Sequence, residues 1–280
     1  MKTRNVYIVG GARIPFMKSM TAYRDVSSEE LMTASLKSLV DRYNLEGKTV
    51  GDVALGAVMH SSANWNLARE VVQSSGLHPN TPAYNVQRAC GTSLETTIQI
   101  AHKISSYQIE SGIAGGVDSN SDLPIMVTRS FSQKLVALNS ARTLGEKLRI
   151  FLSFRPSDLK PVPPAVVEPR TGKSMGEHCE LMVKEWKISR QEQDELALAS
   201  HLNAAKAYKD GFYADLVFPF LGKSTDGIMR GDTTLEKLAK LKPAFDRSEK
   251  GTLTAGNSSS LTAGSSTVLL ASEDEATKNT

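Results

Sequence analysis

Short apolar runs alternate with helix-type segments over the first 120 residues, and this pattern limits the folds open to the chain. The strand-type runs are Val6–Val9, Val53–Met59, 83–87 and Ile113–Val117. Helix-type segments begin near Ser27, span about 66–75 and follow Cys90. Because strands that alternate with helices form crossover units, we expect a mostly parallel sheet covered by helices.

Two of these helices carry clear local signals. Ser27 and Glu30 have the spacing of a capping box, which predicts a helix start. The apolar residues that follow share one helical face: Met32, Leu36, Leu39 and Tyr43. In the helix after Cys90, the same spacing predicts an apolar face of Leu94, Ile98, Ala101 and Ile104.

The pattern changes between about residues 121 and 245. A proline-rich stretch, Pro156–Pro169, lies there, and Ser189 with Glu192 forms a second capping-box pair that starts a helix through about Tyr208. The helix before it carries an apolar stripe of Met175, Cys179, Met182 and Trp186. Since this region has no clear strand, it is predicted to be a helical insertion in an α/β fold.

The strand pattern resumes near the end of the chain. A Gly/Ser loop at 256–266 precedes a strand at Thr267–Ala271, and Ser272 to Glu275 have the signals of a helix start. Few residues follow, too few for a stable helix body. We therefore expect the chain to be part of a longer protein.

Composition narrows the class of protein. A length of 280 residues predicts two units. Lys and Arg total 33 against 30 acidic residues, which gives no case for nucleic-acid binding. The two cysteines are too few for a disulfide framework and fit a reducing, cytoplasmic compartment. A strand that starts at Val6 leaves no room for a signal peptide, and no apolar run approaches the roughly 18 residues of a membrane span.

Cys90 is the candidate nucleophile. It lies where the apolar run at 83–87 turns into a helix, and a helix start offers free N–H groups and a positive dipole end, which both favour a thiolate. Gly91 has no side chain, so a substrate carbonyl could approach these amides. The alternative is a small buried hydrophobic residue, which is the commonest role of a free cysteine.

Other motifs give weaker signals. The spacing around Gly10 and Gly11 does not fit a dinucleotide-binding loop. The run His178-Cys179-Glu180 lacks a second ligand pair, so no metal site is expected. The remaining histidines have no partner spacing and are interpreted as structural or surface residues: His60, His78, His102 and His201.

The segment from 131 to 154 mixes apolar and basic residues. This composition indicates an amphipathic basic helix or helix pair that could meet an anionic membrane surface or a partner groove. A domain helix with a solvated basic face is the alternative.

Four ordered motifs resemble those of the thiolase family. They are Asn85-Val86-Gln87-Arg88-Ala89-Cys90-Gly91-Thr92-Ser93, Met175-Gly176-Glu177 followed by 188–194, Leu241-Lys242-Pro243-Ala244-Phe245-Asp246, and Gly251-Thr252-Leu253-Thr254-Ala255-Gly256-Asn257-Ser258-Ser259. The insertion around 129–165 is most similar to the β subunit of the fatty-acid oxidation multienzyme complex.

The resemblance implies a thiolase-like βαβ layered domain with a mixed sheet covered by helices, plus a largely helical loop domain. It implies a nucleophile-bearing N-terminal domain at 1–121 and 246–280, a CoA-covering loop domain at 122–245, and a C-terminal thiolase domain that this chain lacks.

The resemblance also implies an acetyl-CoA C-acyltransferase of fatty-acid β-oxidation, acting by 3-ketoacyl-CoA thiolysis or acetyl-CoA condensation. Cys90 matches the acylated cysteine, and its amide matches part of the oxyanion hole. CoA-binding positions of the family match Met175, Arg230, Leu241, Phe245, Ala255 and Ser259. Acyl-CoA is the implied substrate, with no covalently bound cofactor, and a cytoplasmic homodimer is the implied assembly. A multienzyme α subunit is a further partner.

This sequence departs from the family pattern in several places. Ala263 stands where an acid is usual, and Ser174 stands where many thiolases have a histidine. The chain has no Gly-His-Pro segment and no second Cys-x-Gly segment, so activity of this chain alone is expected to be impaired. Two other readings stay open: a non-catalytic acyl-CoA-binding or docking module, and a ketoacyl synthase of the same fold.

Overall fold

The computed structural model describes residues 3–278, which divide into two compact units. One unit combines residues up to Asp122 with those from Lys173 onward, and the other spans Leu123–Gly172. The predicted loop domain at 122–245 is larger than this second unit, and its boundaries stay a prediction.

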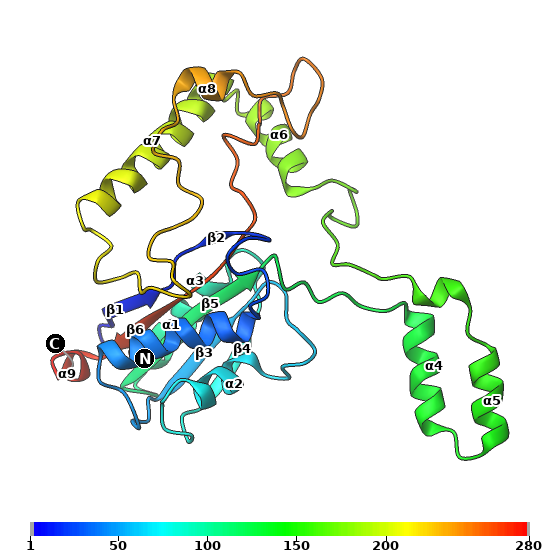
Figure 1. Ribbon diagram of the computed structural model, residues 1–280. Helices are drawn as coiled ribbons and strands as arrows, with labels where there is room; N and C mark the ends of the chain where they lie inside the picture. Colours follow the sequence, from blue (N-terminus) through cyan, green and yellow to red (C-terminus); the bar gives the residue numbers. More distant parts are fainter. Residues whose placement is uncertain (1–2, 279–280) are drawn as a thin grey trace. The chain divides into compact units, whose positions relative to one another are not determined.

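The elements lie along the chain as follows (Figure 1). The strands are β1 (Tyr7–Arg13), β2 (Met17–Lys18), β3 (Asp52–Gly56), β4 (Ala83–Val86), β5 (Ser111–Ser119) and β6 (Thr262–Ala271). The helices are α1 (Ser28–Arg42), α2 (Leu67–Ser74), α3 (Thr92–Ser105), α4 (Arg129–Ser140), α5 (Leu144–Leu152), the 3₁₀ turn η1 (Pro156–Leu159), α6 (Met175–Glu185), α7 (Arg190–Lys209), α8 (Leu235–Ala239) and α9 (Glu273–Ala276).

The first unit is built on a mixed sheet, which confirms the predicted α/β fold class. The expectation of a mostly parallel sheet was wrong, because the described strands form two parallel and three antiparallel pairings. Its strand order is β1-β6-β5-β3-β4, with β2 paired to β6. Strands β3, β4 and β5 run parallel, whereas β6 is antiparallel to both β1 and β5. The carboxyl ends of β3, β4 and β5 therefore meet at one edge of the sheet.

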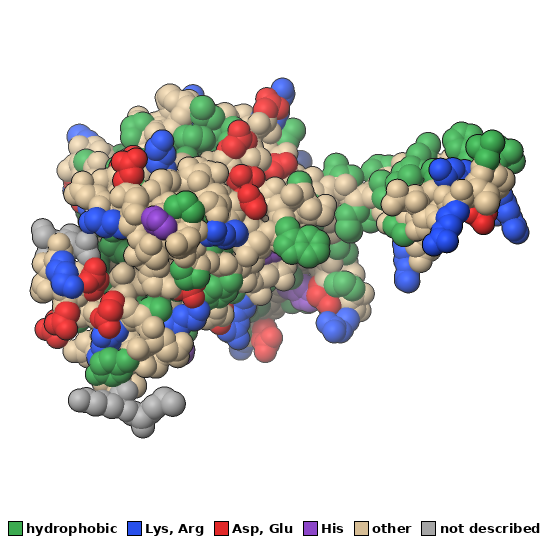
Figure 2. Space-filling model, turned by 90° about the horizontal axis from the view of Figure 1, so that it is seen from below, with side chains coloured by type: hydrophobic (Ala, Val, Ile, Leu, Met, Phe, Trp, Pro, Cys, Tyr) green, Lys and Arg blue, Asp and Glu red, His purple; other side chains and the backbone are tan. Residues whose placement is uncertain are grey.

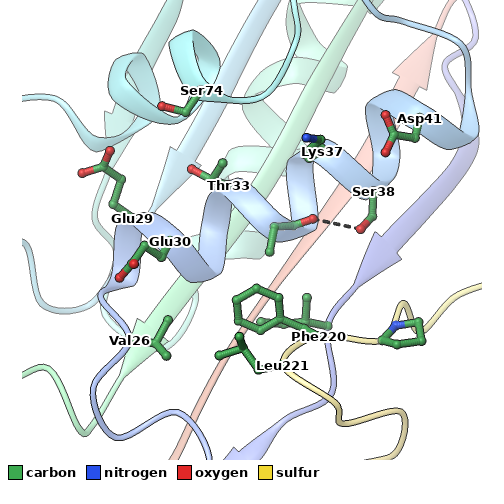
Figure 3. Close-up of a pocket in the computed structure, with 13 residues that line it drawn as sticks. Val26, Glu29, Glu30, Thr33, Lys37, Ser38, Asp41, Ser74, Phe220 and Leu221 are labelled. Carbon is green, nitrogen blue, oxygen red and sulfur yellow. Dashed lines mark hydrogen bonds between the residues drawn. The ribbon is translucent and has the colours of Figure 1, made fainter.

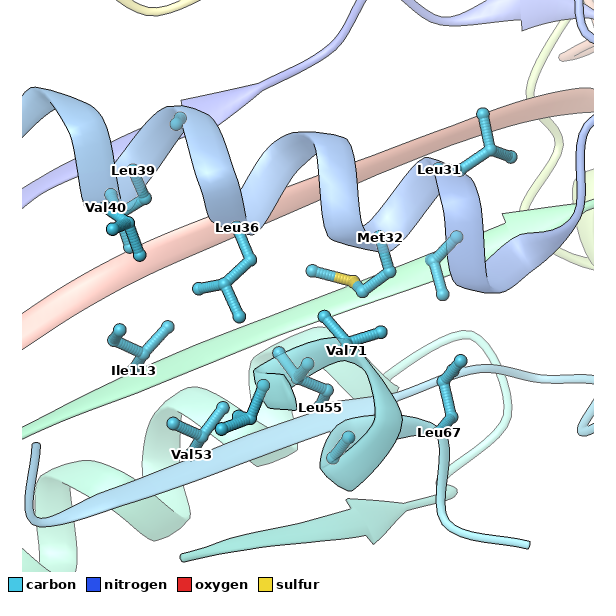
Figure 4. Packing of buried hydrophobic residues seen from close by; sticks show 14 of the residues in the cluster. Leu31, Met32, Leu36, Leu39, Val40, Val53, Leu55, Leu67, Val71 and Ile113 are labelled. Carbon is cyan, nitrogen blue, oxygen red and sulfur yellow. The ribbon is translucent and has the colours of Figure 1, made fainter. Parts of the chain in front are cut away.

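Helices cover both faces of this sheet. On one face, α1 and α2 pack against alternate strand residues such as Val53, Leu55 and Ile113, and these side chains are fully buried (Figure 4). Burial of each such side chain contributes roughly 1.5–3 kcal/mol. The capping box at the start of α1 forms as predicted, with the Ser27 N–H donating to Glu30 (2.8 Å) and the Glu30 N–H donating to Ser27 Oγ (3.2 Å).

Helix α3 covers the other face, but with a different side from the one predicted. Leu94 is 66% exposed and Ile98 is exposed, while Thr92, Thr96, Ile100 and Ile104 are the buried residues. The strands beneath α3 offer small side chains, including Ala54 and Ala114. Small residues of α3 approach these strands closely, so the predicted face is wrong at Leu94 and Ile98. It is right at Ile104, which is buried, and at Ala101, which packs against the same cluster.

Helices α6 and α7 begin where the sequence indicates. Ser189 and Glu192 form the predicted capping box, and Ser174 with Glu177 forms another at the start of α6. The apolar stripe on α6 lies on its solvent side, with Met175 65% exposed, and the residues that α6 buries are Glu180 and Val183. Because Glu180 is a buried acid, α6 must offer its carboxylate to hydrogen-bond donors of a neighbouring segment.

The second unit is a helix pair. Helices α4 and α5 contain no buried residue, and the unit is held by aromatic contacts of Phe154 with Phe131 and Phe151. Asp158 is buried and accepts a hydrogen bond from Lys134 Nζ (2.6 Å), which lowers the pKa of Asp158 to about 2. The prediction of a basic helix or helix pair over 131–154 is thus resolved in favour of a pair.

The chain's last described helix is short. Ser272 is the N-cap of α9, but its hydroxyl donates to Glu110 (2.6 Å) instead of accepting from the helix, so the predicted capping box does not form. Among residues 3–278, no helix has both the length and the apolar character needed to cross a membrane.

Candidate active site

Cys90 lies at the tip of a tight turn between β4 and α3. The Gly91 N–H donates to the Arg88 carbonyl (3.0 Å), and the Thr92 N–H donates to the Ala89 carbonyl (3.2 Å). Ala89 has φ +44°, a left-handed conformation that costs energy for a residue with a side chain and that is concentrated at functional sites. Cys90 itself is exposed, so the alternative of a buried small hydrophobic residue is wrong.

Thr92 fixes this turn. Its Oγ1 accepts from the Arg88 N–H (2.8 Å) and donates to the Ala89 carbonyl (2.7 Å), and the residue is only 4% exposed. The Thr92 methyl lies against Gly56 of β3. A Cβ added at Gly56 would be 2.3 Å from Thr92 Cγ2 and 2.2 Å from the Val86 carbonyl oxygen. Gly56 is therefore required for the close packing beneath Cys90.

The start of α3 beside Cys90 is open. Its N-cap is Gly91, which has no side chain to bond the first-turn N–H groups. Unsatisfied N–H groups and the helix dipole together favour an anionic or carbonyl oxygen at this end. Arg88 forms an ion pair with Glu95, whose pKa is lowered by hydrogen bonds from Gln99 and Arg88.

Asp118 supports the same edge of the sheet, and the sequence analysis missed it. The carboxylate, at the end of β5, accepts from the N–H groups of Val58 (2.9 Å) and Met59 (3.3 Å). Gln87 Nε2 donates to the Val58 carbonyl (2.9 Å), so the 58–59 segment is tied to both neighbouring strand ends. Burial raises the pKa of Asp118, against the lowering effect of these hydrogen bonds and of His60. The available signal was an acid at the carboxyl end of a predicted parallel strand.

Four of the six predicted CoA-binding residues lie around paired loop segments. The Phe245 ring lies on Gly176, the residue after Met175. A Cβ added at Gly176 would be 2.1 Å from the Phe245 ring. Leu241 lies in the same way on Gly256, the residue after Ala255. A Cβ added at Gly256 would be 2.4 Å from Leu241 Cδ1.

These contacts are supported by main-chain pairing. The Ala244 N–H donates to the Leu253 carbonyl (2.8 Å), and Pro243 pairs with Thr254. All four side chains are exposed: Met175, Leu241, Phe245 and Ala255.

The other two predicted residues lie apart from this group. Arg230 is exposed, and its N–H donates to Nδ1 of His201 on α7 (3.3 Å). Ser259 is exposed, and its hydroxyl bonds only the Ser260 carbonyl (3.5 Å). Within residues 3–278, no hydrogen bond or ion pair joins Cys90 to any of the six.

No group of three or more potential metal ligands occurs within the described part of the chain. In the run His178-Cys179-Glu180, the Glu180 carboxylate accepts hydrogen bonds from the main-chain N–H groups of Thr252 and Leu253.

A separate cavity of about 600 Å³ lies beside α1 (Figure 3). Its apolar wall includes Val26, Phe220 and Leu221, and α1 contributes the polar residues Thr33 and Lys37. The Ser38 hydroxyl, which also lines the cavity, donates to the Ala34 carbonyl of the same helix (2.9 Å). None of the lining residues is Cys90 or one of the six predicted CoA-binding residues, so the cavity is distinct from the candidate active site.

Comparison with known proteins places the chain in a family. Residues 6–274 match the thiolase N-terminal domain family. The chain is 41% identical over 283 residues to a 3-ketoacyl-CoA thiolase of a Shewanella species, covering 98% of this chain and 64% of that protein. It is 42% identical over 277 residues to a 3-ketoacyl-CoA thiolase of Pectobacterium atrosepticum, covering 97% of this chain and 63% of that protein.

Solved structures give the same result. Human mitochondrial 3-ketoacyl-CoA thiolase in complex with CoA matches with a TM-score of 0.79 and 27% identity, over 98% of this chain and 66% of that chain. The acetyl-CoA acetyltransferase of Bacillus anthracis matches with a TM-score of 0.82 and 29% identity, over 99% and 68%. The chain therefore belongs to the thiolase family, and it spans less than two thirds of the length of these sequence relatives.

Proposed function

We propose that this thiolase-family chain accepts acyl groups from coenzyme A on Cys90, in 3-ketoacyl-CoA thiolysis or acetyl-CoA condensation. The observation that supports it most strongly is the exposed Cys90 thiol on a strained turn directly before an uncapped helix start. When the Cys90 sulfur attacks a thioester carbonyl, the C–S bond to CoA breaks and the CoA thiolate takes the proton that Cys90 loses. When it attacks the 3-keto carbonyl, the C–C bond to the acetyl unit breaks and the acetyl-CoA carbanion takes that proton. In both cases the oxygen that becomes negative in the transition state is stabilised by main-chain N–H groups, beginning with that of Cys90.

The CoA surface proposed for this reaction is formed by Met175, Leu241, Phe245 and Ala255. Their exposed apolar side chains suit the pantetheine arm and the adenine ring, because ligand sites are lined by apolar groups with a few polar ones. Ser259 is proposed to contact the pantetheine arm, and Arg230 the adenine or a phosphate. Neither the cavity beside α1 nor a smaller one near the end of α7 is lined by Cys90 or by these residues.

In thiolases, a histidine and a second cysteine from the C-terminal half complete the reaction. This chain carries neither segment, and Cys179 lies on α6 rather than beside Cys90. Loss of a general base typically costs about 10²–10⁴-fold in rate. We therefore propose that this chain acylates slowly and turns over poorly.

The proposal is tested by mass spectrometry of the chain after incubation with acetyl-CoA. We expect one acetyl group, on Cys90, in the unmodified chain and in the matched control Cys179→Ser, and none in Cys90→Ser. If CoA binds but no adduct forms on Cys90, the nucleophile assignment is refuted.

We also propose that the full protein acts in fatty-acid β-oxidation in the cytoplasm, as a homodimer and in contact with a multienzyme α subunit. The named activity of the bacterial relatives supports the pathway, and the family resemblance supports the assembly.

A second candidate function is docking through the helix pair of the second unit. Helices α4 and α5 bury none of their residues, and apolar side chains such as Leu144 and Phe151 are exposed next to Lys147 and Arg149. Figure 2 shows hydrophobic, Lys and Arg side chains gathered on this pair. Such a surface suits an anionic membrane.

Vesicle flotation tests this candidate. The chain is expected to float with vesicles that contain phosphatidylglycerol and not with pure phosphatidylcholine, and a Lys147→Glu/Arg149→Glu variant should stay behind. Equal flotation of both chains contradicts it.

A further inference from the structure

Two buried carboxylates hold the loop that carries Ala255. The first belongs to Glu180 of α6, which is only 2% exposed. Its Oε1 accepts from the Thr252 N–H (2.8 Å) and the Thr252 hydroxyl (2.9 Å), and its Oε2 accepts from the Leu253 N–H (3.0 Å). Both carboxylate oxygens are thus used to fix one end of the loop.

The second carboxylate belongs to Asp194 of α7, which is 3% exposed. Its Oδ1 accepts from Asn257 Nδ2 (2.9 Å), at the other end of the loop. Asn257 Oδ1 in turn accepts from the Thr254 N–H (2.7 Å). The residues between these anchors, including Ala255, are therefore held by helices on both sides.

Asp194 is also linked to Leu241. It pairs with Arg190 (2.8 Å), whose Nη2 donates to the carbonyls of Leu238 (2.7 Å) and Leu241 (3.2 Å). Because Leu241 lies on Gly256, this chain of hydrogen bonds sets both sides of the contact.

A buried acid is costly unless its charge is satisfied by hydrogen bonds, so these two acids enforce their partners' positions. Loops without such anchors lose freedom when a ligand binds, and that ordering reduces affinity. We propose that Glu180 and Asp194 are positioning residues that pre-order the 252–257 loop and Leu241 for coenzyme A. This inference rests on the CoA surface proposed above, and neither acid is assigned a contact with the ligand.

The test is calorimetric titration of the full chain with CoA. Glu180→Gln places an amide N–H₂ opposite a main-chain donor, and we expect CoA binding to weaken about tenfold, equivalent to about 1.4 kcal/mol. Thr252→Val keeps both main-chain bonds to Glu180 and removes the hydroxyl, which donates to Glu180 and accepts from Gln193 Nε2 (3.1 Å), so it is expected to weaken binding by a smaller factor. Asp52→Asn is the matched control, because it neutralises a buried acid that pairs with Lys103 outside the proposed CoA surface and the predicted loop domain, and it should leave CoA binding unchanged.

Two further readouts separate positioning from general stability. Amide hydrogen exchange should accelerate at 252–257 in Glu180→Gln, while the alkylation rate of Cys90 by iodoacetamide should match the unmodified chain. If Glu180→Gln fails to fold, Thr252→Val with the same readouts decides the question.

The outcomes are distinct. Equal CoA affinity of the folded variants and the unmodified chain overturns the positioning role and leaves the proposed function intact. Absence of CoA binding by the unmodified chain refutes the proposed CoA surface, and this inference with it. Weaker binding with faster local exchange and unchanged Cys90 alkylation supports the inference.

Discussion

Gly56→Ala is expected to disturb the turn that carries Cys90. The new Cβ would lie 2.2 Å from the Val86 carbonyl oxygen and 2.3 Å from Thr92 Cγ2, and real Cβ contacts essentially never fall below 3.0 Å. One neighbour is main chain in a parallel strand pair, and the other is a stiff β-branched side chain that is 4% exposed. Neither can move without shifting β4 or α3.

The cost follows from the size of this clash. Overpacking of a tight core typically costs about 1–3 kcal/mol, and two simultaneous contacts more than 0.5 Å too short place Gly56→Ala at the upper end, about 3 kcal/mol. For a unit of this size, that lowers the thermal midpoint by roughly 6–12 °C. A displaced Thr92 also loses its hydrogen bonds to Arg88 and Ala89, so alkylation of Cys90 should change in rate.

The assay is thermal unfolding monitored by circular dichroism, together with the iodoacetamide rate at Cys90. Gly91→Ala is the matched control, because its Cβ would be 3.5 Å from the nearest atom, an ordinary contact, and its midpoint should stay within about 2 °C. If Gly56→Ala unfolds like the unmodified chain and Cys90 reacts at the same rate, Gly56 does not constrain the turn.

Two further titratable groups give predictions, because removal from water raises the pKa of each. Tyr23 is buried with no hydrogen-bond partner for its hydroxyl among the described residues, so Tyr23→Phe should stabilise the chain by about 1 kcal/mol in urea unfolding. Burial raises the pKa of Tyr23 to about 12, so the unmodified chain should lose stability as the pH rises from about 10 toward 12. If Tyr23→Phe loses the same stability over this range, the loss does not come from Tyr23. Burial also raises the pKa of Asp118, so the native state keeps this proton to a higher pH than the unfolded chain. Unfolding free energy should therefore fall as the pH rises from about 3.9 through the folded pKa of Asp118, and Asp118→Asn should flatten that slope; an unchanged slope would assign it to another group.

Local signals predicted the helix starts, because they depend on residues three positions apart. The Ser27–Glu30 and Ser189–Glu192 pairs form capping boxes in the structure, and the strand-to-helix turn at Cys90 lies where it was expected. Such signals can be recognised without knowing which distant residues pack against the helix.

Features that depend on distant residues could not be predicted in the same way. The buried side of α3 was only partly predicted, because Ala54 and Ala114 on the strands beneath it allow a close approach that favours Thr92 and Thr96 over Leu94. Glu180 gave no signal because its partners are 72 and 73 residues away, and one acid among many has no pattern of its own. Ser272 had the signals of a helix cap, but the competing acceptor Glu110 took its hydroxyl.

For the proposed acetyl transfer from CoA to Cys90, the rate and the final extent of labelling depend on different things. Transfer of an acetyl group from CoA to Cys90 breaks one C–S bond and forms another, and the leaving CoA thiolate takes the proton that Cys90 loses. Because a thioester is exchanged for a thioester, the equilibrium is set chiefly by the ratio of acetyl-CoA to CoA, whereas a missing general base slows only the approach to it. Excess acetyl-CoA should therefore drive this chain slowly to one acetyl group at Cys90, and added CoA should reverse the label. A label that forms but resists excess CoA would show that the sulfur is not in exchange with the coenzyme, which would leave the exposed turn without the acyl-transfer role proposed for it.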